Sequence, residues 1–223
     1  MERKIVKYPI RYRDRYLKVK PMPTLIIGAR CRDGVIIVAD RRIVRGAECT
    51  TEKKIFMPYT GVVVAASGLT GIIDKFRREV EARAGAMRAQ TLDEVIEVIE
   101  DVTEKMKSRY TPRLYETPKG GVIIEALVGG LSYLTQGEAE LHHVFQEGYA
   151  EIVKEYMPIG YASDEAKVFL KALYRKDANV SEMLDVLTLP IILIEEFEVD
   201  TTVGGKPQIY TIMDLSPVKI KIP

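Results

Sequence analysis

The stretch TLIIGARCRDGVIIVAD, residues 24–40, sets the expectation for the fold of the chain. It holds two short runs rich in β-branched residues, 24–30 and 35–40, separated by Asp33-Gly34. An Asp-Gly pair between two such runs is a strong signal for a β-hairpin. Both runs are apolar at nearly every position, which is typical of strands covered on both faces. The sequence therefore predicts an antiparallel sheet that is buried on both sides.

Further strands and helices are predicted after this hairpin. A third strand at 61–67 leads past Gly68 into a helix over 69–87. Thr91 and Glu94 have the spacing of a capping box and open a second helix, which fades at 110–112. The other predicted elements are strands at 121–130, 140–146, 150–156, 208–214 and 218–222, a helix capped by Ser163, and a helix from Ser181 to near Glu198 that contains Pro190.

The order of these elements predicts the fold class. Groups of strands alternate with pairs of helices, which does not fit the strand–helix–strand winding of a parallel sheet. The order fits two stacked antiparallel sheets flanked by helices, a four-layer αββα sandwich of the α+β class. Residues 24–223 contain no internal repeat and no low-complexity linker, so we expect them to form one domain.

Composition excludes several classes of protein. The chain has 223 residues, of which 47% are apolar and 29% charged, as in ordinary soluble globular proteins. We find no apolar run of about 18 residues that would cross a membrane, and no secretory signal, so we expect a cytoplasmic protein. The two cysteines, Cys31 and Cys49, cannot form a disulfide framework and lack the spacing of a metal site.

Residues 1–23 differ from the rest of the chain in charge. They hold eight basic and two acidic residues, whereas the remaining 200 residues hold 25 basic and 30 acidic ones. Prolines in this segment argue against a helix, so we expect an extended basic N-terminal arm or leader. It could pair with a neighbouring subunit, bind an acidic polymer such as nucleic acid, or lie on the protein's own acidic surface. We favour the last alternative and do not expect nucleic acid as a partner.

Few residues indicate chemistry by themselves. The sequence has no phosphate loop, dinucleotide fingerprint or GxSxG nucleophile elbow. His142 and His143 are adjacent in a predicted strand, so their side chains point to opposite faces and do not easily share a metal. We expect one of them at the surface and the other partly buried. Cys31 follows a buried strand and is expected to pack rather than to act as a nucleophile.

A set of short motifs occurs in a fixed order along residues 24–220. It comprises a Thr that opens the first strand, an Ala-Asp-x-Arg end to the second strand (39–42), a Lys-Lys-x-Phe segment (53–56), SGLTG (67–71), ALVGG (126–130), GYAS (160–163) and VDTTVGG (199–205). In this order the set resembles the β-type subunits of the proteasome, which are N-terminal-nucleophile hydrolases. The α-type subunits have similar strands, but residues 1–23 lack their N-terminal helix and its lead-in motif. The resemblance implies the same sandwich, assembled with other proteasome-like subunits into homo- or hetero-oligomeric rings.

The resemblance also implies an activity, that of a threonine-type endopeptidase acting on polypeptide substrates. Its nucleophile would be Thr24, freed by removal of residues 1–23. In the family the Thr hydroxyl attacks the peptide carbonyl, and the α-amine of the same residue acts as the base. This solves a chemical problem, because a hydroxyl needs a base within hydrogen-bond reach and a terminal amine titrates at about pH 8. The chemistry requires no metal and no organic cofactor.

Other positions match residues with defined roles in the family. Lys54 matches the lysine whose charge lowers the pKa of the Thr hydroxyl and amine, and Asp40 matches its acidic partner. Asp200 matches an acid near the amine, and Arg42 matches a supporting residue. The N–H of Gly68 matches the donor to the oxyanion, where a fixed dipole stabilises the transition state of acyl transfer. The same matching suggests a specificity pocket lined by Ile43, Glu52, Ala66 and Thr70, in which Glu52 would favour a basic side chain.

The chain departs from the family pattern near the proposed nucleophile. Pro23 stands where processed subunits usually carry Gly, and Leu25 replaces a second Thr. Tyr161 and Val203 stand at the positions of two supporting serines. These differences keep a second hypothesis open, in which the protein is an unprocessed, non-catalytic structural or regulatory subunit of the same fold.

Overall fold

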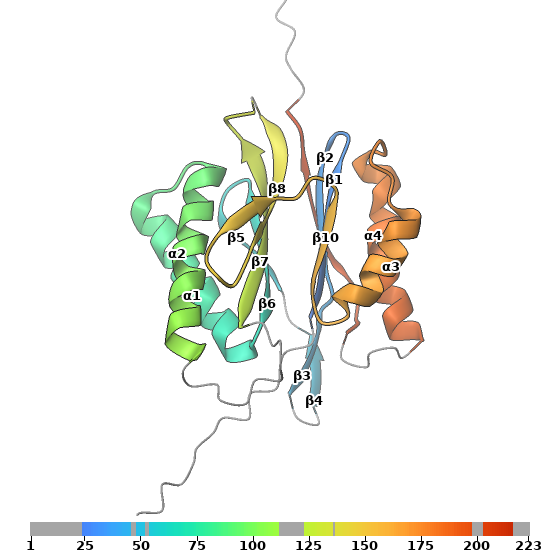
Figure 1. The fold of residues 1–223 in the computed structure, drawn as a ribbon, viewed down its shortest axis with the longest axis horizontal. Coiled ribbons are helices and arrows are strands. Elements are labelled where there is room, and N and C mark those ends of the chain that lie inside the picture. The colour runs from blue at the N-terminus through green and yellow to red at the C-terminus, as the bar shows by residue number, and fades with distance from the viewer. Residues whose placement is uncertain are drawn as a thin grey trace, which may run out of the picture.

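The computed structural model describes residues 24–45, 48–51, 54–111, 123–135, 137–197 and 203–215. Two antiparallel sheets lie face to face, and a pair of helices covers the outer side of each sheet (Figure 1). This confirms the predicted α+β class and the four-layer arrangement. The basic arm at 1–23 and the predicted strand at 218–222 lie outside the described residues.

The first sheet is built on the predicted hairpin. Its strands run in the order β10 (Tyr156–Gly160), β1 (Leu25–Cys31), β2 (Gly34–Ala39) and β11 (Gln208–Met213). The predicted hairpin is confirmed. Its register pairs Cys31 with Gly34, so the chain reverses at Arg32-Asp33, one residue earlier than the predicted Asp33-Gly34.

The second sheet has five strands, and a separate hairpin lies outside both sheets. The five follow the order β5 (Ile55–Tyr59), β6 (Val62–Gly68), β7 (Ile124–Ser132), β8 (Glu138–Val144) and β9 (Ala150–Ile152). The separate hairpin consists of β3 (Arg42–Arg45) and β4 (Glu48–Thr51). It extends beyond one end of the sandwich, directly after β2 (Figure 1).

Four helices form the outer layers: α1 (Thr70–Met87), α2 (Leu92–Tyr110), α3 (Ser163–Leu173) and α4 (Val180–Glu196). The predicted capping box of α2 is confirmed, because the hydroxyl of Thr91 accepts the N–H of Glu94 at 3.2 Å. The predicted cap of α3 is wrong. Ser163 is its first helical residue, and Ala162 precedes it in the left-handed conformation with no side-chain cap bond.

The start of α4 also differs from the prediction. Asn179 caps this helix with a box completed by Glu182, so the helix begins at Val180 rather than at Ser181. Pro190 lies inside the helix and is buried, as the sequence places it. Among the described residues, no helix is both long and apolar enough to cross a bilayer.

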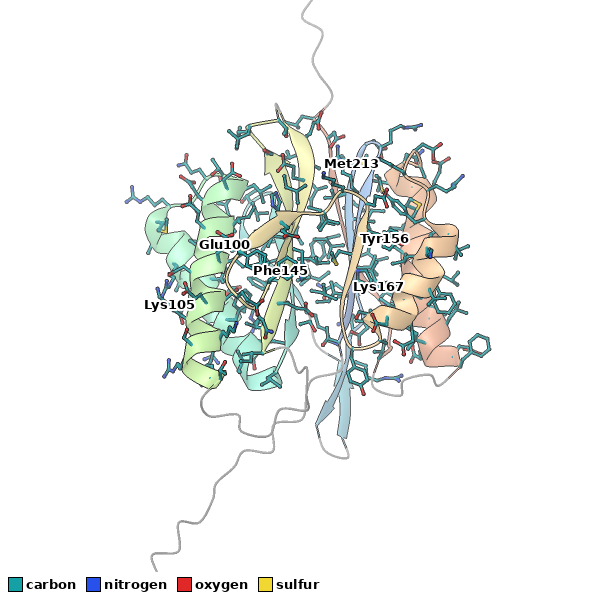
Figure 2. The ribbon with its side chains drawn as sticks, in the orientation of Figure 1. Glu100, Lys105, Phe145, Tyr156, Lys167 and Met213 are labelled. Atoms are coloured by element: carbon teal, nitrogen blue, oxygen red, sulfur yellow. The ribbon has the colours of Figure 1, made fainter. Side chains whose placement is uncertain are left out.

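Three hydrophobic layers hold the four structural layers together. One lies between α1, α2 and the second sheet and includes Phe76 and Ile99, both fully buried. Another lies between α3, α4 and the first sheet and includes Leu187. The middle layer, with Ile37 and Leu127, fills the space between the two sheets (Figure 2). Side chains of β1 alternate between the middle layer and the α3–α4 layer, which explains why this strand is apolar on both faces.

The strand pattern differs from the prediction in two places. The run 150–156 is not one strand, because β9 ends at Ile152 in the second sheet and β10 starts at Tyr156 in the first. The segment 55–59 was not predicted as a strand but forms β5. β5 and β10 each contain a proline, Pro58 and Pro158, and each lies at the edge of its sheet. An edge strand tolerates proline because its outward side makes no ladder hydrogen bond.

Candidate active site

Four strand ends meet at the end of the sandwich from which the β3–β4 hairpin extends (Figure 1). Thr24 directly precedes β1, and Asp40 directly follows β2. The register pairs Leu25 of β1 with Gly160, the last residue of β10. Lys54 precedes β5 and contacts Asp40, which brings the second sheet to the same place. The polar residues are therefore positioned by three strand ends of the first sheet and by the start of β5, the edge strand of the second.

Asp40 and Lys54 form a buried ion pair. The ammonium nitrogen of Lys54 lies 2.7 Å from Oδ1 of Asp40, and the two side chains are 2% and 0% exposed, respectively. A charge removed from water in this way needs a partner and further hydrogen bonds. The pairing predicted from the family pattern is thus present in the structure as a contact.

Asp40 also receives backbone donors from three segments. Its Oδ1 accepts the N–H of Leu25 at 2.9 Å, and its Oδ2 accepts the N–H of Arg42 at 3.2 Å and that of Gly204 at 3.4 Å. The N–H of Asp40 returns a bond to the carbonyl of Leu25 at 3.0 Å. Burial raises the pKa of the Asp40 carboxyl above its ordinary value, while the charge of Lys54 and the N–H donors of Leu25 and Gly204 act in the opposite direction. One carboxylate therefore fixes β1, the start of β3 and the turn at 203–205.

Arg42 supports that turn from the other side. Its guanidinium donates to the carbonyl of Val203 at 3.2 Å and contacts the carboxylate of Glu195 near the end of α4. Glu195 in turn accepts the N–H of Gly205 at 2.9 Å. Sequence reasoning missed Glu195, although a pair of acids at the end of the strongly apolar helix α4 was a usable signal.

Gln208 of β11 holds the backbone next to Lys54. Its Oε1 accepts the N–H of Lys54 at 3.1 Å and that of Ile55 at 3.4 Å, and its Nε2 donates to the carbonyl of Ile55 at 3.3 Å. A side-chain amide that accepts the N–H and donates to the carbonyl of the same residue imitates the backbone pairing of a neighbouring strand. Nothing in the sequence pattern singled out Gln208, because its role depends on the approach of two separate sheets.

Thr24 lies beside this network and is fully buried. Its hydroxyl has no hydrogen-bond partner among the described residues. Its carbonyl accepts the N–H of Tyr161 at 2.7 Å, just after β10. Gly160 has φ +88°, and a Cβ there would lie 2.0 Å from the Thr24 carbonyl oxygen, so only glycine fits against the candidate nucleophile.

Gly68 ends β6 with φ +149°, and a Cβ there would lie 2.3 Å from the carbonyl oxygen of Ile123. The backbone at the proposed oxyanion donor is thus held in a conformation that requires glycine. Ala66, two residues earlier, is buried in the hydrophobic layer against α1 and α2. Of the other predicted pocket residues, Ile43 lies in β3 and Thr70 begins α1, and the orientation of their side chains is not described. Glu52 and Asp200 lie outside the described residues.

Cys31 and the two histidines do not form a competing centre among the described residues. Burial raises the pKa of Cys31 to about 11, so its thiol stays protonated and is a poor nucleophile at neutral pH. Both histidines are buried, so the expectation of a surface histidine is wrong. His142 pairs with Glu140 and His143 with Glu125, on opposite faces of β8. In the described part of the chain no group of three or more His, Cys, Asp or Glu residues is placed to hold a metal ion.

Comparison with known proteins identifies the family of the chain. Residues 22–212 match the family described as proteasome subunit. Proteasome subunit beta 1 of Thermococcus gammatolerans is 27% identical over 186 residues, which cover 74% of this chain and 89% of the relative. Proteasome subunit beta 2 of Thermofilum pendens is 27% identical over 167 residues, covering 74% and 77%.

A solved structure agrees in fold. Anbu, an ancestral beta-subunit from Yersinia bercovieri, superposes with a TM-score of 0.70 at 15% identity, over 85% of this chain and 81% of that one. The family match spans the first strand through β11 and includes Thr24, Asp40 and Lys54. The chain therefore belongs to the proteasome subunit family, as a β-type subunit.

Proposed function

We propose that the protein is a threonine-type endopeptidase that becomes active when residues 1–23 are removed and Thr24 becomes the N-terminus. The observation that carries the proposal is the buried pair of Asp40 and Lys54, whose shared oxygen also accepts the N–H of Leu25. A buried lysine whose partner oxygen also binds the residue that follows a strand-opening threonine is costly to maintain as a purely structural feature. It is useful where a nearby hydroxyl has to lose its proton.

The proposed reaction uses this chain's own groups. The free α-amine of Thr24 takes the hydroxyl proton while the oxygen attacks the substrate carbonyl, and the amine then returns the proton to the leaving amine. Water hydrolyses the resulting ester by the same proton transfers and restores the Thr24 hydroxyl. The positive charge of Lys54 favours the deprotonated hydroxyl, and Asp40 keeps that charge in place. The N–H of Gly68 is the proposed donor to the oxyanion.

Removal of the leader has two proposed consequences. An internal Thr24 has an amide nitrogen, which is no base, whereas cleavage after Pro23 would give it an amine. Thr24 is also fully buried in the full-length chain. The second proposed consequence is therefore that removal of residues 1–23 uncovers the Thr24 hydroxyl, so that a substrate can reach it. Family membership suggests assembly with other proteasome subunits. We propose rings of such subunits around an enclosed chamber, in the cytoplasm, with Ile43, Glu52, Ala66 and Thr70 as pocket residues and Asp200 near the amine.

The intact mass of the purified protein tests the proposal. Wild-type protein and a Thr24→Ala control are expressed in parallel, assembled, and treated with an electrophilic β-lactone that acylates nucleophilic threonine. We expect wild type alone to lose residues 1–23 and to gain one label on Thr24. A processed, assembled protein that takes no label and cleaves no fluorogenic peptide would refute the endopeptidase.

A second candidate function is a non-catalytic subunit that keeps its leader. Two observations favour it: the Thr24 hydroxyl has no hydrogen-bond partner in the part of the chain that the structure describes, and Val203 cannot supply the bond that a serine would make at its position. In this case wild type and Thr24→Ala both keep residues 1–23, so each shows its own full-length mass even after assembly. Recovery of Thr24 as the mature N-terminus from cells would contradict this alternative.

A further inference from the structure

The carbonyl of Thr24 is held by a strand end that itself depends on the other sheet. The N–H of Tyr161 donates to the carbonyl of Thr24. The N–H of the neighbouring Gly160 donates to a different acceptor, Oε1 of Glu125, at 3.0 Å. Glu125 lies on β7, in the second sheet, whereas Gly160 ends β10 at the edge of the first. The carboxylate of Glu125 thus links the two sheets at Gly160, which pairs with Leu25, the residue after the candidate nucleophile.

His143 orients that carboxylate. Its Nε2 lies 3.2 Å from Oε2 of Glu125, and the two side chains are 6% and 15% exposed. An ionised carboxylate only accepts hydrogen bonds, so the contact is a hydrogen bond in the tautomer of His143 that carries its hydrogen on Nε2. The ring centroid of His143 lies 4.0 Å from that of Phe145, labelled in Figure 2, which stacks on Tyr149. The imidazole is therefore packed as well as paired.

The backbone of Gly160 packs too closely against Thr24 to leave room for a side chain. A Cβ at Gly160 would lie 2.0 Å from the carbonyl oxygen of Thr24 and 2.5 Å from the hydroxyl oxygen of Ser67. Ser67 in turn pairs with Glu125 in the β6–β7 register. Any shift of the β10 end therefore moves Thr24 directly. Glu125 also stands out in the sequence as the one charged residue of the apolar strand β7.

We propose that Glu125, oriented by His143, is a positioning residue that sets the Thr24 carbonyl, and with it the nucleophile, through Gly160 and Tyr161. This inference rests on the proposed endopeptidase function. The pair neither contacts substrate nor transfers a proton. Its effect is geometric, and a misplacement of about 1 Å at a reacting group can cost about 100-fold in rate.

The chain offers a matched control on the opposite face of β8. His142 and Glu140 form the same kind of pair, with Nε2 and Oε2 3.0 Å apart and side chains 10% and 16% exposed. This second pair does not contact Gly160 in any hydrogen bond of the described residues. Glu140→Leu therefore removes an equivalent buried pair without touching the support of Thr24.

The test compares Glu125→Leu, Glu125→Gln and Glu140→Leu in the full, processed protein with a fluorogenic peptide. We expect Glu125→Leu to lower kcat about 10- to 100-fold while KM stays within about threefold, because the change affects orientation rather than binding. Glu125→Gln keeps an oxygen acceptor, though a weaker one, and should give an intermediate fall. Glu140→Leu should match wild type. Equal kcat values in all four proteins would overturn the proposal.

A second readout separates this inference from the proposed function. Hydrogen–deuterium exchange of the peptide covering 156–161 reports whether the Gly160 N–H is protected, whatever the activity. If wild type proves inactive, the endopeptidase proposal fails, yet faster exchange in Glu125→Leu than in Glu140→Leu would still support the positional link. If Glu125→Leu does not fold, Glu125→Gln carries both readouts. Unchanged exchange and unchanged kcat in that variant would refute the positioning role.

Discussion

Oδ1 of Asp40 accepts both the ammonium group of Lys54 at 2.7 Å and the N–H of Leu25 at 2.9 Å, so one oxygen joins the lysine to the first strand. The strand that carries the candidate nucleophile and the cation that would activate it cannot move independently. A change at either residue is therefore expected to affect stability and chemistry together.

Breaking the pair should be costly. Lys54→Met leaves Asp40 buried without its cation, and we expect the free energy of unfolding to fall by about 3–5 kcal/mol. The double variant Asp40→Asn/Lys54→Met removes both charges and should recover part of that loss. Urea denaturation of both, beside wild type, measures the difference.

The control for this prediction is an exposed pair. Lys105 and Asp101 pair on the outer face of α2, with side chains 52% and 47% exposed. Lys105→Met should cost less than about 1 kcal/mol, because water screens such a pair. Equal losses for Lys54→Met and Lys105→Met would show that burial of the Asp40–Lys54 pair has no energetic effect.

The pH dependence of stability should show the raised pKa of Asp40. In the unfolded chain the pKa of Asp40 is 3.8, and in the folded chain it is higher, so the folded chain keeps the Asp40 proton up to a higher pH. The stabilising contribution of Asp40 is therefore fully present below pH 3.8 and is lost as the pH rises through the folded pKa. The stability advantage of wild type over Asp40→Asn should then shrink as the pH rises through this window, as urea midpoints can show. An advantage that grows across the window would mean that Lys54 and the N–H donors outweigh burial.

Two glycines allow backbone strain to be separated from steric contact. Gly160 and Gly61 have nearly equal φ values, +88° and +86°, but a Cβ at Gly61 meets nothing within 4 Å. Gly61→Ala should cost only the left-handed strain, about 1–2 kcal/mol, and leave labelling of Thr24 unchanged. Gly160→Ala adds a collision with Thr24 and should cost more and abolish labelling. Calorimetry and the β-lactone label report the two effects, and equal behaviour of the two variants would contradict the close contact at Thr24.

The helix caps give a test of the fold itself. Asn179→Ala removes the side-chain amide oxygen that accepts the N–H of Glu182 at 2.9 Å, and it should cost about 1 kcal/mol. Ser181→Ala and Ser163→Ala should be nearly neutral, because neither residue caps a helix in the structure. Thermal denaturation of the three variants decides this. A larger loss at Ser163 would favour the cap expected from the sequence.

Local signals predicted much of the fold. Asp33-Gly34 marks the first hairpin, and Thr91 with Glu94 marks the start of α2, because in each case residues close in sequence make the decisive bonds. The edge strands β5 and β10 were not predicted with their observed bounds, and each holds a proline that only its place at a sheet edge makes compatible with a strand. Element order was a better guide than any single strand, because it limits how the layers can stack.

The candidate site was predictable only through the family pattern. Nothing local couples Asp40 to Lys54, and their contact depends on how β2 approaches the start of β5. Glu195, Gln208 and Glu125 were missed because their partners lie in distant segments of the chain. Acids in apolar elements, such as Glu125 in β7 and Glu195 in α4, are signals that a buried partner exists, although they do not say which one.

The prolines of β5 and β10 also affect how copies of the protein meet. Pro58 and Pro158 remove a donor from two sheet edges, and β9, at a third edge, has only three residues. Edges of this kind are poor templates for pairing with a strand of another chain. Of the four edges of the two described sheets, three therefore resist edge-to-edge pairing between copies of the chain, whereas β11 at the fourth edge has six residues and no proline.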